Sequence, residues 1–258
     1  MMDYYYRTYN LAMLGMAVVG LVCFVALFFV KAGYGKFRND KWGLSFSNKA
    51  AWLVMEVPTI VVMLVMLFLS KKDNMLVRVL ISFFFFAHYI QRTFVFPFLL
   101  KGKSKMPILI VLMGMTFNTV NALLIGSWLF HFSPDEMYSP VWLYSPQFII
   151  GAVVFILGFW INVSSDSYIR SLRKPGDTAH YFPNMGMYRY VTSANYFGEL
   201  VEWTGFAILS WSLPAALFVF WTAANLVPRA HAINKSYRQK FPEEFAKTKP
   251  KRIFPFVF

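Results

Sequence analysis

The sequence predicts an all-α integral membrane protein with seven transmembrane helices, its amino terminus outside and its carboxyl terminus inside. Of the 258 residues, 58% are hydrophobic and only 14% are charged, and the mean hydropathy is +0.49. A soluble domain is about one quarter charged. The apolar residues also gather in seven segments, and the basic residues concentrate between segments on one side. These three observations together predict the fold class.

Polar stretches separate the seven apolar segments, which are residues 11–30, 50–69, 76–100, 107–130, 147–163, 195–211 and 213–227. The first five have the ~17–25 residues that a helix uses to cross a bilayer. The first is longer than the core of a signal peptide, so we expect it to be retained. The last two are short, and a tight turn around Ser212 and Pro214 joins them. No internal repeat is visible, which predicts a single domain over residues 1–258.

Lysine and arginine indicate the inside of the membrane, because short cytoplasmic loops carry an excess of them. With the amino terminus outside, residues 31–49, 101–105, 164–194 and 228–258 lie inside and hold 20 of the 25 basic residues. Four more lie outside when Arg78, near the outer end of the third segment, is counted with Arg7, Lys71 and Lys72. The net charge of +13 is therefore mainly a topology signal and does not indicate nucleic-acid binding. Anionic lipid headgroups or a phosphorylated ligand are the further interpretations.

The second and third segments carry ionisable groups at membrane depth, where each costs at least ~2.5–3.5 kcal/mol and is a functional candidate by default. Glu56 lies inside the second segment, two residues before Pro58. Tyr89 and Arg92 share a face of the third segment, with His88 beside that face. A tyrosine hydroxyl can donate a hydrogen bond to a carbonyl oxygen, and a nearby carboxyl group can orient it. The alternative is a structural ion pair between Glu56 and Arg92.

The fifth segment ends in polar residues of several kinds. Asn162 and Asp166 are four residues apart and share a face, and Arg170 and Arg173 follow toward the inside. Amide, carboxylate and guanidinium groups together suit a ligand with hydroxyl, amide and phosphate groups. Local pairing of Asp166 with Arg170, one helical turn on, is the alternative.

The sixth segment places Asn195, Glu199 and Glu202 on one face, at spacings of four and three residues. Such a face points into a cavity or at a ligand, because lipid cannot satisfy it. The seventh segment continues into Arg229 and Tyr237 on the inside. The polar residues of five segments therefore meet on the inner side. They predict a cytoplasm-facing cavity for an elongated polar cofactor, with an apolar outer half for a lipid-soluble substrate.

Missing motifs disfavour several other classes of protein. The four histidines are widely separated and only one cysteine, Cys23, is present, so we expect neither a metal site nor a disulfide. No glycine-rich dinucleotide fingerprint and no Walker loop occurs, so a nucleotide would be held outside a Rossmann fold. A lipid-binding or transport protein without chemistry is an alternative. The absence of an inverted repeat disfavours it. A transport path would also need polar residues that continue to the outer side, where the fourth segment has only Asn118, Asn121 and His131.

Short motifs along almost the whole chain match one enzyme family. They are G-Y-G-K-F at 33–37, E-V-P-T at 56–59, H-Y-I-Q-R-T-F-V-F at 88–96, I-N-V-S-S-D at 161–166, L-R-K-P-G at 172–176, Y-V-T-S-A-N-Y-F-G-E-L-V-E-W-T-G at 190–205, W-S-L-P-A at 211–215, P-R-A at 228–230 and the closing I-F-P-F-V-F. On these motifs the chain resembles the steroid 5α-reductases, membrane enzymes that use NADPH to reduce the C4–C5 double bond of 3-keto-Δ4 steroids. The second and third motifs favour this branch over related sterol and enoyl reductases.

The resemblance implies roles for individual residues. Glu56 and Tyr89 would bind the C3 carbonyl of the steroid, while Tyr34, Arg92 and Glu202 would lie around the substrate or behind it. Tyr89 would stabilise the enolate that forms as a hydride reaches C5, after which C4 is protonated. The residues expected to contact NADPH are Asn162, Asp166, Arg173, His180, Asn195, Glu199, Arg229, Tyr237 and Lys103.

Three positions depart from the family pattern. His180 stands where the family usually has a tyrosine, and either it or the adjacent Tyr181 could stack on the adenine. Ile233 replaces a histidine, a loss for which His231 could substitute. Met113 replaces an arginine in the fourth segment. These departures concern the outer contacts of the cofactor and the choice of substrate.

The expected activity is NADPH-dependent reduction of 3-keto-Δ4 steroids to 5α-reduced steroids, in a bacterial inner membrane or in the endoplasmic reticulum. The lipophilic steroid would enter from the bilayer, whose lipids surround the chain, and we expect no nucleic acid and no obligate protein partner. A reductase of another conjugated lipid, such as a sterol or an enoyl substrate, is the alternative within enzymes. A more distant one is a membrane methyltransferase that uses S-adenosylmethionine.

Overall fold

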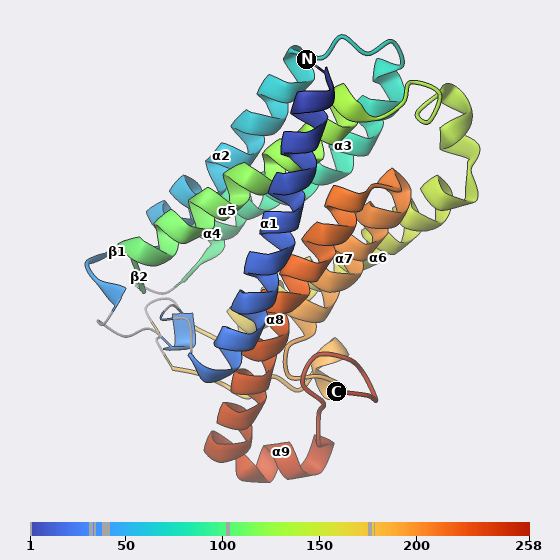
Figure 1. Cartoon of the computed structure of the whole chain (residues 1–258). Coiled ribbons are helices and arrows are strands. Elements are labelled where there is room, and N and C mark those ends of the chain that lie inside the picture. The colour runs from blue at the N-terminus through green and yellow to red at the C-terminus, as the bar shows by residue number, and fades with distance from the viewer. Residues whose placement is uncertain are drawn as a thin grey trace.

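The computed structural model describes residues 2–30, 33, 35–37, 42–101, 104–174, 177 and 179–258, and it shows a bundle of long helices (Figure 1). The helices are α1 (Met2–Phe29), α2 (Asn48–Phe68), α3 (Met75–Ile90), α4 (Phe96–Leu99), α5 (Ile108–Ser127), α6 (Pro146–Ser171), α7 (Ala194–Ser210), α8 (Leu213–Lys240) and α9 (Pro242–Thr248). Two short strands, β1 (Ser45–Ser47) and β2 (Lys105–Pro107), pair antiparallel with Phe46 opposite Met106. The end of the bundle where α6 and α8 finish and α7 begins is called the α9 end.

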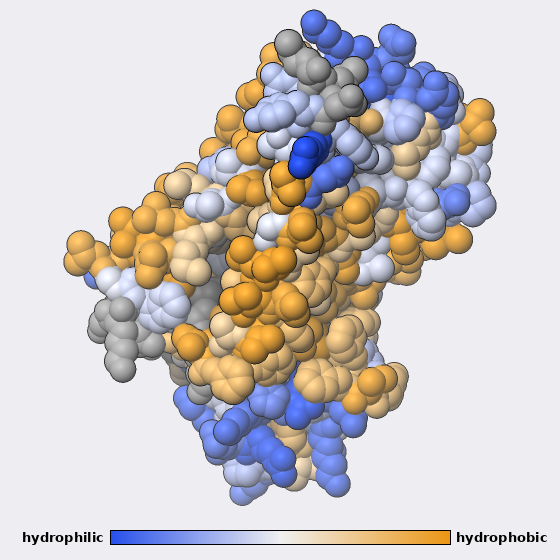
Figure 2. All heavy atoms as spheres, in the orientation of Figure 1, coloured by the Kyte–Doolittle hydropathy of each residue, from blue (hydrophilic) through white to orange (hydrophobic). Residues whose placement is uncertain are grey.

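Six helices of the described residues are long and apolar enough to cross a membrane, namely Tyr4–Phe29, Asn48–Phe68, Met75–Leu99, Ile108–Phe132, Pro146–Ser171 and Leu213–Lys240. The chain is therefore a mostly helical, multi-pass membrane protein, as the sequence predicts. The sixth predicted segment is also a helix, α7, but its 17 residues make it shorter than these six. Figure 2 shows apolar side chains along the middle of the bundle and polar side chains toward its two ends.

Two helices continue well beyond the carboxyl-terminal ends of the apolar segments that predict them. Helix α6 continues to Ser171 and α8 continues to Lys240. The apolar segments follow hydropathy, whereas the backbone hydrogen bonds of a helix also form where the side chains are polar. Pro228 removes one backbone donor from α8 without ending the helix. As a result, Asp166 and Arg229 stand on regular helix and not in loops.

Helices α6 and α7 are in backbone contact along their length because glycines lie between them. A Cβ atom at Gly158 of α6 would meet the backbone nitrogen of Glu202, and one at Gly198 of α7 would meet the backbone nitrogen of Asn162. Small residues at such an interface let two membrane helices approach closely. The contact brings the polar residues of the two helices together at the α9 end.

The third span changes from α-helical to π-helical geometry over Gln91–Val95. Pro97 has no backbone N–H to donate to the carbonyl of Thr93, which interrupts the regular ladder of hydrogen bonds. Arg92 lies in this π-helical turn. Its guanidinium group stacks on the ring of Trp52 in α2, 4.5 Å from the ring centroid. The irregular turn therefore places the arginine between neighbouring helices.

The core that supports the site is aromatic. Trp203 of α7 packs against Phe218 of α8, with ring centroids 4.4 Å apart, and against Phe85 of α3 at 5.9 Å. At the end of the bundle opposite α9, the fully buried Arg78 forms a 3.0 Å ion pair with Asp135 in the loop after α5. These contacts hold α3, α7 and α8 in fixed positions.

Candidate active site

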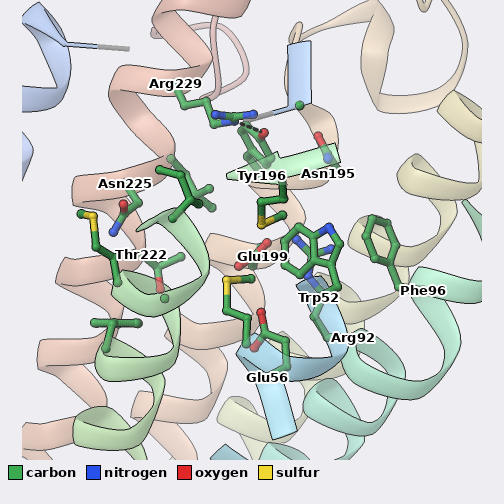
Figure 3. A pocket seen from close by; sticks show the side chains of 18 of the residues that line it. Trp52, Glu56, Arg92, Phe96, Asn195, Tyr196, Glu199, Thr222, Asn225 and Arg229 are labelled. Atoms are coloured by element: carbon green, nitrogen blue, oxygen red, sulfur yellow. Dashed lines mark hydrogen bonds between the residues drawn. The ribbon is translucent and has the colours of Figure 1, made fainter. Parts of the chain in front are cut away.

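A cavity of about 1120 Å³ lies between α1, α2, α3, α5, α6, α7 and α8. Figure 3 shows Arg229 and Asn195 at one end, Glu56 at the other, and Glu199 and Arg92 between them. Pockets for small molecules usually measure ~300–1,000 Å³. The cavity is therefore large enough for more than one small molecule.

One wall of the cavity is mainly apolar and comes from α1, α5 and α8. Its side chains include Met16, Val19, Cys23, Met113, Phe117, Phe218 and Trp221. The indole nitrogen of Trp221 donates a 2.8 Å hydrogen bond to the backbone oxygen of Met16, which ties α8 to α1. Such a wall suits a lipid-soluble ligand.

Asp166 is the centre of a polar network on the opposite wall. Its Oδ2 atom forms an ion pair with Nη1 of Arg92 at 3.4 Å, and its Oδ1 atom accepts a hydrogen bond from Nδ2 of Asn195 at 2.9 Å. Asn162 donates through Nδ2 to the backbone oxygen of Asn195, also at 2.9 Å. The network joins the π-helical turn after α3 to α6 and α7 across the glycine contact. Glu199, half-buried on α7, also lines the cavity.

The α9 end of the cavity is rich in guanidinium groups. Arg170, Arg173 and Arg229 all line it. Nε of Arg229 donates a 2.8 Å hydrogen bond to the hydroxyl of Tyr196. Nη1 of Arg170 is buried and finds no hydrogen-bond partner within the described part of the chain. A buried donor without a partner costs free energy unless a ligand satisfies it. This end therefore suits an anionic ligand such as a phosphate.

Glu56 and Tyr89 lie deep in the cavity and are both buried. Oε2 of Glu56 accepts a 2.9 Å hydrogen bond from Nδ2 of Asn118 in α5, and the same nitrogen lies 3.0 Å from the backbone oxygen of Met55. Tyr89 packs against Phe85 with ring centroids 4.6 Å apart. The amide of Asn118 fixes the carboxyl group of Glu56, and aromatic rings fix the side chain of Tyr89. Their polar atoms are therefore preorganised.

Next to Tyr89, His88 also lines the cavity and pairs with Glu202 of α7. Nδ1 of His88 lies 2.8 Å from Oε1 of Glu202, whose side chain has 0% exposure. Glu202 does not reach the cavity. The pair therefore links a ring on the cavity wall to an acid behind it.

Comparison with known proteins identifies the family. A family profile described as "3-oxo-5-alpha-steroid 4-dehydrogenase" matches residues 104–258. The chain is 35% identical over 243 residues to 3-oxo-5-alpha-steroid 4-dehydrogenase 1 of Bos taurus, which covers 93% of each chain. It is 33% identical over 256 residues to steroid 5-alpha-reductase DET2 of Gossypium hirsutum, with 97% of each chain covered.

The chain belongs to the steroid 5α-reductase (3-oxo-5-alpha-steroid 4-dehydrogenase) family. This confirms the resemblance that the motifs indicate, and it places the chain among oxidoreductases that act on CH–CH groups.

The cavity brings together most of the site residues predicted from the 5α-reductase motifs. Those that line it are Glu56, Tyr89, Arg92, Asp166, Arg173, His180, Asn195, Glu199, Arg229 and Tyr237. Asn162, predicted as a direct contact, does not line it, because its side chain is turned to the backbone of Asn195. Glu202 lies behind His88. Tyr34 and Lys103 fall outside the residues that the structure describes.

The three departures from the 5α-reductase pattern also have definite positions. His180 lines the cavity, whereas Tyr181 does not. Tyr181 donates a 2.7 Å hydrogen bond to Oδ2 of Asp177, which raises the pKa of the tyrosine hydroxyl. Ile233 lines the cavity, and His231 lies instead against the ring of Phe28 on α1, with centroids 6.1 Å apart. Met113 is part of the apolar wall.

Several lining residues are absent from the set predicted on the 5α-reductase motifs. Asn118 is assigned from sequence to the outer end of the fourth segment, yet the structure places it in the cavity beside Glu56. A polar residue midway along an apolar segment is the signal that points to it. Trp52, Arg170 and Trp203 also line the cavity. Aromatic residues are common in membrane helices, so the two tryptophans have no distinctive sequence signal.

Proposed function

We propose that this chain uses NADPH to reduce the C4–C5 double bond of 3-keto-Δ4 steroids, giving 5α-reduced steroids. One observation carries the proposal. A single cavity combines an apolar wall, the neighbouring Glu56 and Tyr89, and a cluster of guanidinium groups at its α9 end. A steroid ketone requires the first two features and a dinucleotide phosphate requires the third. The steroid reaches the apolar wall from the bilayer, because helices of the membrane bundle form that wall.

The residues at the α9 end fit NADPH by their charge. Arg170, Arg173 and Arg229 provide guanidinium groups, which bind phosphate oxygens through paired hydrogen bonds. The unpartnered nitrogen of Arg170 supports this, because a phosphate oxygen could satisfy it after a rotation of the side chain. We assign Asn195 and Glu199, further into the cavity, to the nicotinamide end. When bound there, NADPH supplies the hydride that the steroid receives at C5.

Tyr89 and Glu56 act on the carbonyl end of the steroid. The Tyr89 hydroxyl donates a hydrogen bond to the C3 oxygen, and Glu56, held by Asn118, orients that hydroxyl. Negative charge develops on the C3 oxygen as C5 is reduced. A preorganised donor at such an oxygen contributes ~2.7–4 kcal/mol, or 10²–10³ in rate. The apolar wall excludes water from this end, which strengthens the hydrogen bond.

We further propose that α7 is a seventh, short span, so that the amino terminus lies outside and the carboxyl terminus inside. Its close contact with α6 supports this, as does the concentration of basic residues in the loops on one side. Accessible tags on the two termini, probed in sealed vesicles, test the arrangement. Tags on opposite faces support it, and tags on one face contradict it.

The activity is tested with purified protein, NADPH and a panel of 3-keto-Δ4 steroids, following the absorbance of NADPH and the mass of the product. The expected product is heavier by two hydrogens and saturated between C4 and C5. Sterol and enoyl substrates form a second panel. Reduction of that panel alone would point to another conjugated lipid. Stabilisation of the protein by S-adenosylmethionine and not by NADPH would contradict the assignment of the cofactor.

A further inference from the structure

His88 and Glu202 form a buried pair, and neither residue has a role in the proposed binding of the steroid C3 carbonyl or of NADPH. Glu202 is fully buried, and its Oε2 atom has no hydrogen-bond partner among the described residues. Its Oε1 atom lies 2.8 Å from Nδ1 of His88. A buried carboxylate is costly unless a partner compensates it. Within the described part of the chain, the His88 ring is the partner that does so.

The orientation of the ring follows from this contact. Glu202 lies behind the cavity wall, whereas His88 is part of that wall. The two nitrogens of an imidazole point to opposite sides of the ring. Because Nδ1 is turned toward Glu202, Nε2 is turned away from it, on the cavity side. A carboxylate that accepts from one ring nitrogen fixes the hydrogen-bonding role of the other.

The contact with Glu202 favours a cationic ring. A carboxylate oxygen 2.8 Å from Nδ1 stabilises the positive charge of an imidazolium ion. An imidazolium ion has a proton on both nitrogens, one for Glu202 and one facing the cavity.

His88 is also next to the group assigned to the C3 oxygen. The rings of His88 and Tyr89 have centroids 5.2 Å apart and meet edge to face. In a 3-keto-Δ4 steroid, C4 is bonded to the C3 carbonyl carbon. A steroid whose C3 oxygen is bound by Tyr89 would therefore have its C4 near the part of the wall that His88 forms.

We propose that His88, held by Glu202, delivers the proton that C4 of the substrate takes up after C5 has received the hydride. The N–H bond at Nε2 breaks and a C–H bond forms at C4, with the electron pair coming from the C3–C4 double bond of the enolate. The C3 carbonyl is restored, His88 becomes neutral, and a proton from the solution recharges it after the product has left the cavity. His88 is then a catalytic residue and Glu202 a positioning residue. The inference rests on the proposed function.

The first test compares His88→Gln and Glu202→Gln with the unmodified protein. The amide oxygen introduced by Glu202→Gln can still accept from Nδ1, so a purely structural link between α3 and α7 survives in that variant. We expect kcat to fall about 10²-fold or more in His88→Gln, within the 10²–10⁴ range of general acid catalysis. In Glu202→Gln we expect kcat to fall about tenfold with KM for NADPH unchanged, because the carboxylate charge is lost. His131→Gln, on an exposed histidine outside the cavity lining, is the matched control.

Chemical rescue and nitrogen NMR separate catalysis from packing. In His88→Gly, added imidazole should restore turnover, and substituted imidazoles should do so according to their basicity. In the unmodified protein labelled with ¹⁵N-histidine, the His88 signals should show two protonated ring nitrogens, and Glu202→Gln should remove one of them. The NMR experiment needs no turnover, so it decides the question even where a His88 variant fails to fold.

The outcomes distinguish the inference from the proposed function. Steroid reduction by the unmodified protein together with unchanged kcat in both variants, or a neutral His88 with bare Nε2, overturns the inference alone. No reduction of any steroid by the unmodified protein overturns the proposed function, and the inference with it. Loss of kcat in both variants with imidazole rescue supports the inference.

Discussion

Asn118 of α5 holds the carboxyl group of Glu56 on α2, through a 2.9 Å hydrogen bond from Nδ2 to Oε2. The same amide also reaches the backbone oxygen of Met55, so one side chain fixes both the carboxyl group and the helix turn that carries it. All three residues are buried or nearly so. Asn118 is therefore positioned to set the direction in which Glu56 faces the cavity.

We expect Asn118→Ala to lower kcat about tenfold, corresponding to ~1.4 kcal/mol, because Glu56 loses its fixed orientation. The Kd for NADPH should stay unchanged, since the proposed cofactor site is at the other end of the cavity. Steady-state kinetics and a binding titration measure the two quantities. Thr119→Ala, which removes a hydroxyl bonded only within α5, is the control and should retain its activity. An Asn118→Ala variant with the kcat of the unmodified protein would show that Glu56 does not depend on Asn118 for its orientation.

Tyr89→Phe and Glu56→Gln should each reduce turnover about 10²–10³-fold, the usual loss when one preorganised donor to a developing oxyanion is removed. Both changes keep the volume of the side chain, so the aromatic packing of Tyr89 against Phe85 remains. NADPH should still raise the unfolding temperature of both variants. Single-turnover reduction of a 3-keto-Δ4 steroid gives the chemical rate. Wild-type rates in either variant would remove the proposed role of that residue.

The sequence predicts which residues face the cavity better than it predicts how they pair. Asp166 stands just beyond an apolar segment and Asn195 at the start of one, each at helical spacing from other polar residues, and both line the cavity because lipid cannot satisfy them. The pairings that the sequence offers as alternatives are Glu56 with Arg92 between two segments and Asp166 with Arg170 at helical spacing. The ion pair in the structure is instead Arg92 with Asp166.

The reason is that spacing along one helix describes a shared face but not the rotation of one helix against another. That rotation depends on contacts such as the one between Gly158 and the backbone at Glu202, and on the π-helical turn that carries Arg92. The spacing of residues in the sequence predicts neither feature. The same limit explains why Asn118, although visible as a polar residue in an apolar segment, cannot be assigned to Glu56 from sequence.

The glycine contact between α6 and α7 should be sensitive to a single methyl group. In Gly158→Ala the new Cβ meets backbone atoms of Glu202, which cannot move as a flexible side chain would. We expect the free energy of unfolding to fall by about 1–3 kcal/mol, the typical cost of overpacking. Stabilisation by NADPH should also weaken, because α6 and α7 separate at the Asp166 network. Thermal unfolding with and without NADPH measures both effects.

Gly15→Ala provides the matched control for that substitution. Gly15 is also in a membrane helix, but a Cβ there meets nothing within 4 Å. The unfolding temperature of the Gly15→Ala variant should equal or exceed that of the unmodified protein, because alanine favours a helix more than glycine does. Equal destabilisation by the two substitutions would mean that the contact between α6 and α7 is not the cause.

Arg170 should contribute to NADPH binding although the motifs do not single it out. Arg170 lines the cavity, and its buried Nη1 atom has no partner among the described residues, so a rotation of the guanidinium group toward a phosphate oxygen would gain a charge-assisted hydrogen bond. We expect Arg170→Ala to raise the Kd for NADPH about tenfold, or ~1.4 kcal/mol, with a smaller change in kcat. Arg189→Ala, an exposed arginine outside the cavity, should leave Kd unchanged in the same titration. If both variants bind NADPH as tightly as the unmodified protein, the phosphates lie elsewhere, and Arg173 and Arg229 become the next substitutions to measure.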